Sequence, residues 1–205
     1  FNPVQLVFGS LVRGQITEEC VGKSVLIICS STAYNRYNKD PELSALFSCA
    51  SVTFEHGFKT NPSLTDIIEI SNKYRDSSLD LIVGLGGGSA MDVAKIASVS
   101  IPAIKEGIHI DDLLKDSTLF SRFKEIDCIQ VPTTAGTGSE VTPFATVWDY
   151  ESQQKKSLSH PLMYAKKAFI DPDFLSQVPL EVAISTGLDA LNQAFESIWN
   201  VNANE

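Results

Sequence analysis

Residues 84–95 read Gly84-Leu-Gly-Gly-Gly-Ser-Ala-Met-Asp-Val-Ala-Lys95, and this stretch is the most informative part of the chain. A mostly apolar run of strand length, residues 79–83, comes before it, and a mostly apolar run of helix length, residues 90–99, follows. A strand that enters a glycine-rich turn and continues into a buried helix leaves backbone N–H groups free at the helix N-terminus. Glycines let an anion approach the backbone, and the helix dipole adds roughly half a positive charge there. The stretch therefore predicts a phosphate-binding turn.

The spacing of this first turn excludes two better-known phosphate loops. A dinucleotide fingerprint G-x-G-x-x-G counted from Gly84 fails because Ser89 stands at the last glycine position, and no G-x-x-x-x-G-K-[ST] occurs in the chain. A structural alternative is a tight turn in which Ser89 and Asp92 form a capping box, which needs no ligand. Three consecutive glycines are costly in that case, because each weakens a helix or strand by about 0.5–1 kcal/mol relative to alanine. Phosphate binding is the favoured interpretation.

Composition and charge narrow the class of protein. The chain has 205 residues, of which 43% are hydrophobic and 20% charged, as in an ordinary globular protein with a full core. A net charge of −9 argues against nucleic acid or an anionic membrane as a partner. No apolar run reaches the roughly 18 residues of a membrane span, and no signal-peptide pattern opens the chain, which favours a cytoplasmic location.

The cysteines and histidines lack the spacing of a metal or redox site. The four cysteines contain no C-x-x-C, which favours reduced, structural thiols, and the three histidines are expected in loops or at the surface.

Strands and helices alternate along the chain. This order predicts an α/β fold with a parallel sheet covered on both faces, which binds ligands beyond the carboxyl ends of its strands. A polar turn is expected at Ser30-Ser31-Thr32, and Asp40-Pro41 and Asn61-Pro62 are each expected to start a helix. The expected strands are 4–8, 24–29, 51–55, 79–83, 128–131, 144–148 and 168–170, and the expected helices are 10–20, 41–49, 62–74, 90–99 and 111–115.

A second turn follows the strand at 128–131 and reads Pro132-Thr-Thr-Ala-Gly-Thr-Gly-Ser-Glu-Val-Thr142. It carries two glycines and five hydroxyl side chains. Hydroxyls can bond within their own loop. Because this turn lies one strand from the first turn, a second clamp on the same ligand is the favoured interpretation.

The pattern changes near Pro179, after which residues 180–184 and 188–199 have helical periodicity and no strand follows. We therefore expect a dinucleotide-binding domain over 1–176 and the beginning of a helical metal and substrate domain over 177–205. Because the sequence stops at Glu205 just after an apolar helix, we also expect either a fragment or a last helix that docks on something else.

Three segments together resemble the iron-containing (group III) alcohol dehydrogenase family. They are Gly86-Gly-Gly-Ser-Ala-Met-Asp-Val-Ala-Lys95, the second turn, and Gly187-Leu-Asp-Ala-Leu-Asn-Gln-Ala-Phe-Glu-Ser197, and Ile170-Asp-Pro172 also fits. Family members are longer, so the resemblance covers the nucleotide-binding half and the opening helices of the other half. It implies hydride transfer between NAD(P) and a small alcohol or aldehyde, with iron or zinc polarising the carbonyl. A homodimer is one assembly that it allows.

The resemblance also implies roles for individual residues. The first turn would hold the pyrophosphate, and the second turn would lie against the pyrophosphate and the nicotinamide ribose. A lysine between the following strands, best matched by Lys155, would also reach the cofactor, although a solvated surface charge is an equal alternative for it. The implied cofactor-binding residues are Gly86, Gly87, Gly88, Ser89 and Asp92 in the first segment, Thr133, Thr134, Thr137 and Ser139 in the second, and Lys155.

Two positions depart from the family pattern. Ser30 stands where the family often has an aspartate that binds the ribose of NAD, so we expect NADP(H) to bind at least as well as NAD(H). The metal helix carries Asp189 and Gln193 in place of aspartate and histidine, and an amide is a poor ligand for iron or zinc. We therefore expect no stoichiometric metal on this chain.

No general acid or base stands out in the sequence, so the catalytic residues are unknown. The rival hypothesis is a nucleotide-binding module that has lost catalysis, which Gln193 favours. Among substrates, Glu196-Ser-Ile-Trp199 is similar to family members that are phosphonoacetaldehyde reductases.

Overall fold

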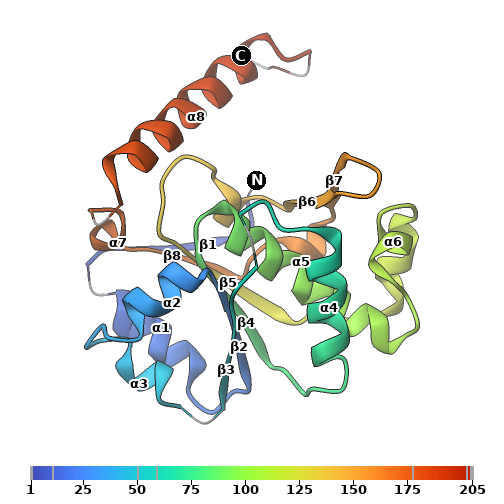
Figure 1. Ribbon diagram of the computed structural model, residues 1–205, viewed down its shortest axis with the longest axis horizontal. Helices are drawn as coiled ribbons and strands as arrows, with labels where there is room; N and C mark the ends of the chain where they lie inside the picture. The colour runs from blue at the N-terminus through green and yellow to red at the C-terminus, as the bar shows by residue number, and fades with distance from the viewer. Residues whose placement is uncertain are drawn as a thin grey trace.

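A computed structural model describes residues 2–10, 12–49, 51–58, 60–176, 178–201 and 203. Its centre is a six-stranded sheet in the order β1-β8-β5-β4-β2-β3, in which every neighbouring pair is parallel (Figure 1). The predicted α/β fold with a parallel sheet is confirmed. The strands are β1 (Gln5–Phe8), β2 (Val25–Cys29), β3 (Val52–Glu55), β4 (Leu81–Gly86), β5 (Asp127–Pro132) and β8 (Lys167–Ile170).

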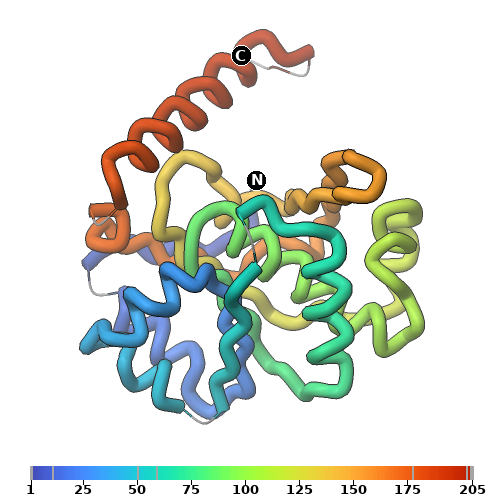
Figure 2. The backbone as a smooth tube through the Cα atoms, in the orientation of Figure 1, coloured from blue at the N-terminus to red at the C-terminus, as the bar shows by residue number. Residues whose placement is uncertain are grey.

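Helices cover both faces of the sheet (Figures 1 and 2). Along β2, Leu26 and Ile28 join the core beneath α4 (Leu64–Tyr74) and α5 (Gly88–Lys105). Val25, Ile27 and Cys29 alternate with them and join the opposite core, beneath α1, α2 and α3. This alternation is the strand period of two, and it explains why the central strands are apolar throughout. The helices of the second face are α1 (Val12–Cys20), α2 (Ser31–Tyr37) and α3 (Ser44–Phe47).

The remaining elements are short or lie at the carboxyl edge. An antiparallel hairpin is formed by β6 (Phe144–Asp149) and β7 (Gln154–Ser159), and only its first strand was expected from the sequence. β7 is mostly polar and exposed, so it carries no apolar pattern from which to predict it. The others are α6 (Ile110–Leu113), η1 (Ser117–Arg122), η2 (Ser139–Val141), η3 (Pro161–Met163) and α7 (Pro172–Ser176).

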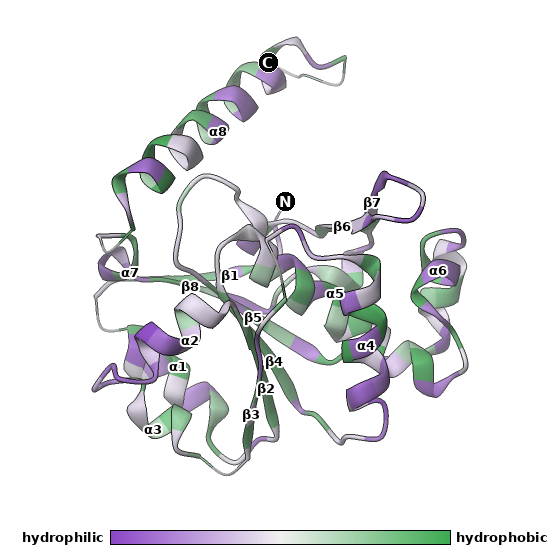
Figure 3. Cartoon of the chain, viewed as in Figure 1, coloured by the Kyte–Doolittle hydropathy of each residue, from purple (hydrophilic) through white to green (hydrophobic). Residues whose placement is uncertain are grey.

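The last helix, α8 (Leu180–Trp199), stands off the sheet, and none of its residues is buried (Figures 1 and 3). It joins the two predicted helical segments into one helix. Large apolar side chains on it are exposed, and the rings of Phe195 and Trp199 stack at 6.2 Å. Within the part of the chain that the structure describes, no helix is long and apolar enough to cross a membrane. The exposed apolar residues of α8 are Leu180, Val182, Ile184, Leu188, Leu191, Phe195, Ile198 and Trp199.

The capping box of Ser89 and Asp92, which was the structural alternative for the first turn, does not form. The N-cap of α5 is Gly87, which has no side-chain hydrogen bond, so Ser89 lies inside the first helical turn. The Asp92 carboxylate instead accepts bonds from the Ser139 hydroxyl at 2.6 Å and the Thr146 N–H at 2.9 Å. The N-terminus of α5 therefore has no cap from this serine and aspartate.

The helix start predicted at Asn61-Pro62 is also wrong. The capping box lies two residues further on, where Ser63 and Asp66 bond each other's backbone N–H groups at 3.0 and 2.7 Å. These two reciprocal bonds satisfy two backbone N–H donors at the N-terminus of the helix. Asn61 and Pro62 do not form such a pair of bonds, so the helix starts after Ser63. Asn61 instead takes a left-handed conformation, with φ at 61°.

Two polar segments between β2 and β3 also differ from expectation. Ser30 does not begin a simple turn; its Oγ accepts the Ala33 N–H at 3.1 Å and caps α2, which was not predicted. The helix expected after Asp40-Pro41 shrinks to α3. One oxygen of Asp40 accepts the N–H groups of Glu42 and Leu43, and the other accepts Arg13, which holds a turn.

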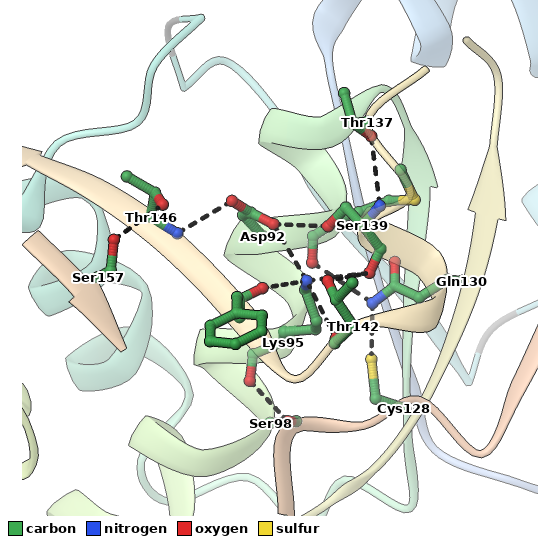
Figure 4. Close-up of polar contacts among 12 residues, drawn as sticks. Asp92, Lys95, Ser98, Cys128, Gln130, Thr137, Ser139, Thr142, Thr146 and Ser157 are labelled. Carbon is green, nitrogen blue, oxygen red and sulfur yellow. Dashed lines mark hydrogen bonds and ion pairs between the residues drawn. The ribbon is translucent and has the colours of Figure 1, made fainter. Parts of the chain in front are cut away.

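Lys95 ties α5 to the segment that follows β5, and its side chain is fully buried. Its ammonium lies 3.2 Å from Asp92 and donates to the carbonyls of Ser139 at 3.0 Å, of Thr142 at 3.4 Å and of Phe144 (Figure 4). Burial lowers the pKa of Lys95, and the Asp92 carboxylate opposes that shift. One cation therefore fixes both the second turn and the start of β6 to the helix.

We expect Lys95→Met to destabilise the fold, because an apolar replacement leaves Asp92 and three carbonyls without their donor. The free energy of unfolding should fall by about 2 kcal/mol and Tm by roughly 4–8 °C. The measurement is a circular dichroism melt. Lys105→Met is the matched control, since Lys105 lies on the same helix with its amine exposed and bonded to the Ser77 carbonyl. Equal losses in the two variants would contradict a special role for Lys95.

Candidate functional site

Two clefts lie on either side of the first turn at the carboxyl edge of the sheet. The larger cleft has a volume of about 450 Å³ and the smaller cleft about 240 Å³. Gly88 lines the larger cleft and Gly87 the smaller, so two consecutive residues of the first turn belong to different clefts. Of the residues predicted from the sequence, the larger cleft holds Gly88, Ser89, Asp92, Thr137, Ser139, Lys155, Asp189 and Gln193, and the smaller holds Ser30, Gly87, Thr133 and Thr134.

Sheet pairing brings the two turns together. β4 and β5 are neighbours in register up to Gly86 and Pro132, and the Thr133 N–H then donates to the Gly86 carbonyl at 2.9 Å. Gly86 is the one predicted residue that lines neither cleft among the described residues, and its carbonyl holds the turns in contact. A backbone hydrogen bond thus joins the two turns, which were expected from the sequence to be neighbours.

The glycines leave room that a side chain would fill. A Cβ on Gly87 would lie 3.0 Å from the Thr134 hydroxyl oxygen, which is closer than such carbons normally come. Behind this opening, α5 begins an 18-residue helix whose N-cap makes no side-chain hydrogen bond. The first N–H groups of any helix have no intrahelical acceptor, and they carry the positive end of its dipole. The opening therefore suits an anion that approaches the backbone closely.

The larger cleft presents hydroxyls, an amine and an indole. Ser89, Thr137 and Ser139 come from the two turns, whereas Lys155 and Trp148 come from the β6–β7 hairpin. The Asp92 carboxylate lines this cleft and already accepts the Ser139 hydroxyl and the Thr146 N–H, so it positions the second turn (Figure 4). The cleft can therefore offer neutral donors and one exposed cation to a polar ligand.

α8 adds Asp189 and Gln193 to the larger cleft. These residues lie one helical turn apart, and the Gln193 amide donates to Asp189 at 3.0 Å. The helix reaches the site because Gly136 has φ at 111° and no side chain. A Cβ there would lie 2.2 Å from the Thr186 carbonyl oxygen. Gly136 thus lets the second turn lie directly against α8.

The donor set on the described residues does not fit a transition metal. No group of three or more histidine, cysteine, aspartate or glutamate side chains comes together among the residues with assigned positions. Asp189 supplies one carboxylate, and its partner is an amide that already donates to it. Iron and zinc prefer three or four ligands that include imidazole or thiolate. The described part of the chain therefore does not by itself build a site for iron or zinc.

The smaller cleft contains Ser30 and a cation that sequence reasoning missed. Arg36 lies on α2, together with Thr32 one turn before it, and both line the cleft with Ser30. The sequence would have indicated Arg36 only if α2 had been predicted, because helical spacing then places residues 32 and 36 on one face of that helix. Trp148 and Asn61, in the larger cleft, were also missed. A residue before a proline and one aromatic residue carry little information by themselves.

The four cysteines are free thiols, of which three are buried, and the three histidines lie in loops as expected. Burial raises the pKa of Cys20 to about 11 and that of Cys29 and Cys128 to about 12, so these thiols are unreactive at neutral pH. Cys49 differs because it is exposed. The three histidines lie outside both clefts: His109 and His160 precede short helices, and His56 stacks on Tyr34.

Two relatives match most of the chain in sequence. Long-chain-alcohol dehydrogenase 1 of Geobacillus thermodenitrificans is 41% identical over 129 residues, which are 63% of this chain and 32% of that protein. Phosphonoacetaldehyde reductase of Streptomyces viridochromogenes is 33% identical over 155 residues, or 72% of this chain and 38% of that one. The chain therefore spans well under half the length of both relatives.

Solved structures agree over nearly the full chain. An iron-containing alcohol dehydrogenase of Thermotoga maritima superposes with a TM-score of 0.84 and 29% identity, covering 100% of this chain and 56% of its own. A sulfoacetaldehyde reductase of Bifidobacterium kashiwanohense, solved with NAD⁺, gives 0.78 and 26%, covering 97% and 52%. The family model for iron-containing alcohol dehydrogenase matches residues 3–172. With its two facing turns and parallel sheet, this chain belongs to the iron-containing alcohol dehydrogenase family.

Proposed function

We propose that the chain is the cofactor-binding part of an NAD(P)-dependent dehydrogenase or reductase for a small alcohol–aldehyde pair. The observation that carries this proposal is the N-terminus of α5, which has no side-chain cap. The two clefts are lined by consecutive glycines at this N-terminus. A dinucleotide has the matching form, because a pyrophosphate joins two nucleosides. When bound, its nicotinamide gives or accepts the hydride.

In this proposal the pyrophosphate lies over Gly86, Gly87, Gly88 and Ser89. The adenosine occupies the smaller cleft beside Ser30, Thr133 and Thr134, and the nicotinamide riboside occupies the larger cleft beside Thr137, Ser139 and Lys155. Asp92 acts from beneath by holding Ser139, as its 2.6 Å bond supports. The hydroxyls orient the cofactor, and the opening between the turns allows its phosphates to reach the backbone.

The substrate class proposed is the alcohol–aldehyde pair. The named relatives differ in substrate, from a long-chain alcohol to phosphonoacetaldehyde, and they share this chemistry. The similarity of residues 196–199 to phosphonoacetaldehyde reductases makes that aldehyde the first substrate to test. We also propose the domain division at 176–177. The absence of any buried residue on α8 supports it.

A catalytically inactive nucleotide-binding module is the second candidate. The bond between Gln193 and Asp189 favours it, because the amide occupies the place of the family's imidazole ligand and engages the carboxylate. Both candidates predict dinucleotide binding, so the metal and the turnover distinguish them.

Gly87→Val should weaken NADP⁺ and NAD⁺ binding at least tenfold, or about 1.4 kcal/mol, because the side chain fills the opening beside Thr134. The measurement is calorimetric titration, with a circular dichroism melt to confirm folding. Gly14→Val is the matched control: Gly14 lies on α1 with open space around its position. Unchanged affinity in a folded Gly87→Val variant would return the first turn to a purely structural role.

Wild-type protein should bind NADP(H) at least as well as NAD(H), because Ser30 has no charge to repel a 2′-phosphate. Ser30→Asp should move the preference toward NAD⁺, since a carboxylate accepts both ribose hydroxyls and repels the phosphate. Competitive titration of the two cofactors measures the ratio. Ser31→Asp adds the same charge at the next residue, and it should change the ratio less. Tenfold tighter binding of NAD⁺ by the wild-type protein would oppose this preference.

The 205-residue chain should carry no stoichiometric iron or zinc and should not reduce aldehydes. Its carboxylate and amide are too few and too weak as ligands. Elemental analysis of protein purified without chelator, together with cofactor-oxidation kinetics on phosphonoacetaldehyde, tests both statements. One equivalent of metal, or turnover that Asp189→Ala abolishes, would indicate a more complete site and would disfavour the inactive module.

A further inference from the structure

Arg36 gives the smaller cleft a charge that its other residues lack. Among the described residues that line this cleft, Arg36 is the one charged side chain. The rest of the lining is hydroxyls, apolar groups and the glycine of the first turn. The whole chain has a net charge of −9, so a cationic cleft lined by hydroxyls is a local exception. Such a cleft suits an anionic group on a ligand.

The sheet fixes where the cleft lies relative to the phosphate-binding opening. β2 and β4 are paired neighbours, with Cys29 opposite Leu85. Ser30 therefore follows β2 beside the first turn, at a strand spacing of about 4.8 Å. A ribose attached to a phosphate on Gly87 would then lie over Ser30. Its 2′ position would face α2, which starts at Ser31.

α2 and its N-cap residue supply three suitable donors to the lining of the smaller cleft. Ser30 accepts the Ala33 N–H with its oxygen, and its own hydrogen can still donate. Thr32 and Arg36 are spaced one turn apart, and both line the cleft. A guanidinium binds a phosphate through two parallel N–H donors, which an uncharged ribose hydroxyl cannot match.

We propose that Arg36 is a specificity-determining residue that binds the 2′-phosphate of NADP(H), with Ser30 and Thr32 as additional donors. The proposal rests on the proposed function, since it requires a dinucleotide with its adenosine in the smaller cleft. It goes further by assigning the positive charge for cofactor choice to α2. Ser30 lacks the negative charge that would repel the 2′-phosphate, whereas the positive charge of Arg36 attracts it.

The test is calorimetric titration of NADP⁺ and NAD⁺ into the 205-residue chain and its variants. Arg36→Gln should weaken NADP⁺ at least tenfold and leave NAD⁺ within twofold. Arg36→Lys keeps the charge without the paired donors, so it should fall between wild type and Arg36→Gln. Lys39→Gln is the matched control: it removes a nearby exposed charge outside the cleft lining and should change neither affinity. A circular dichroism melt reports folding, and Arg36→Lys supplies the comparison if Arg36→Gln does not fold.

A probe without nicotinamide separates this inference from the proposed function. Adenosine 2′,5′-bisphosphate should bind wild type more tightly than 5′-AMP, and Arg36→Gln should remove that advantage. Equal losses for NAD⁺ and NADP⁺ in Arg36→Gln, or no loss for either, would overturn the role of Arg36 and leave dinucleotide binding intact. If wild-type protein binds neither dinucleotide, the proposed function itself fails and the inference falls with it.

Discussion

The buried ammonium of Lys95 is the interaction on which the site depends. It lies on α5 and bonds carbonyls of the second turn and of β6, which are 44 to 49 residues away in the sequence. A buried cation without partners costs several kcal/mol, and the adjacent Asp92 with three carbonyls supplies those partners. An apolar residue of similar size would fill the same space and would not select one conformation of these carbonyls. Lys95 therefore specifies the shape of the loop as well as filling the core.

Asp92 links this core to the cleft above it. Its carboxylate faces Lys95 below, while its two oxygens receive the Ser139 hydroxyl and the Thr146 N–H from separate segments. Asp92 and Ser139 both line the larger cleft, and Asp92 joins Ser139 to the buried ammonium of Lys95. In such a network each member holds the next, so changes at Asp92 or Lys95 should alter the second turn together.

The sequence was sufficient to predict the central strand, the long helix and the two turns, because apolar runs and glycine clusters are local signals. It was insufficient wherever a side chain bonds a distant segment. The Ser-x-x-Asp patterns at residues 63–66 and 89–92 look alike in the sequence, and only the first is a capping box, because the Asp92 carboxylate bonds residues 47 and 54 positions further along the chain. For the same reason, the place of Arg36 in the smaller cleft was not predicted. Its helix starts with polar residues, and its place beside the glycine turn follows from the pairing of β2 with β4.

The two clefts differ in what holds their polar groups. The smaller cleft takes its polar groups from the first turn, the second turn and α2, which follow strands of the sheet, and α8 adds only apolar Val182. The larger cleft also takes Asp189 and Gln193 from α8, a helix with no buried residue that meets the second turn at Gly136. Groups that perform chemistry need supporting contacts to hold them within a fraction of an ångström. The polar groups proposed to bind the cofactor in the smaller cleft are therefore positioned by the sheet, whereas the position of Asp189 depends on the contact between α8 and the second turn.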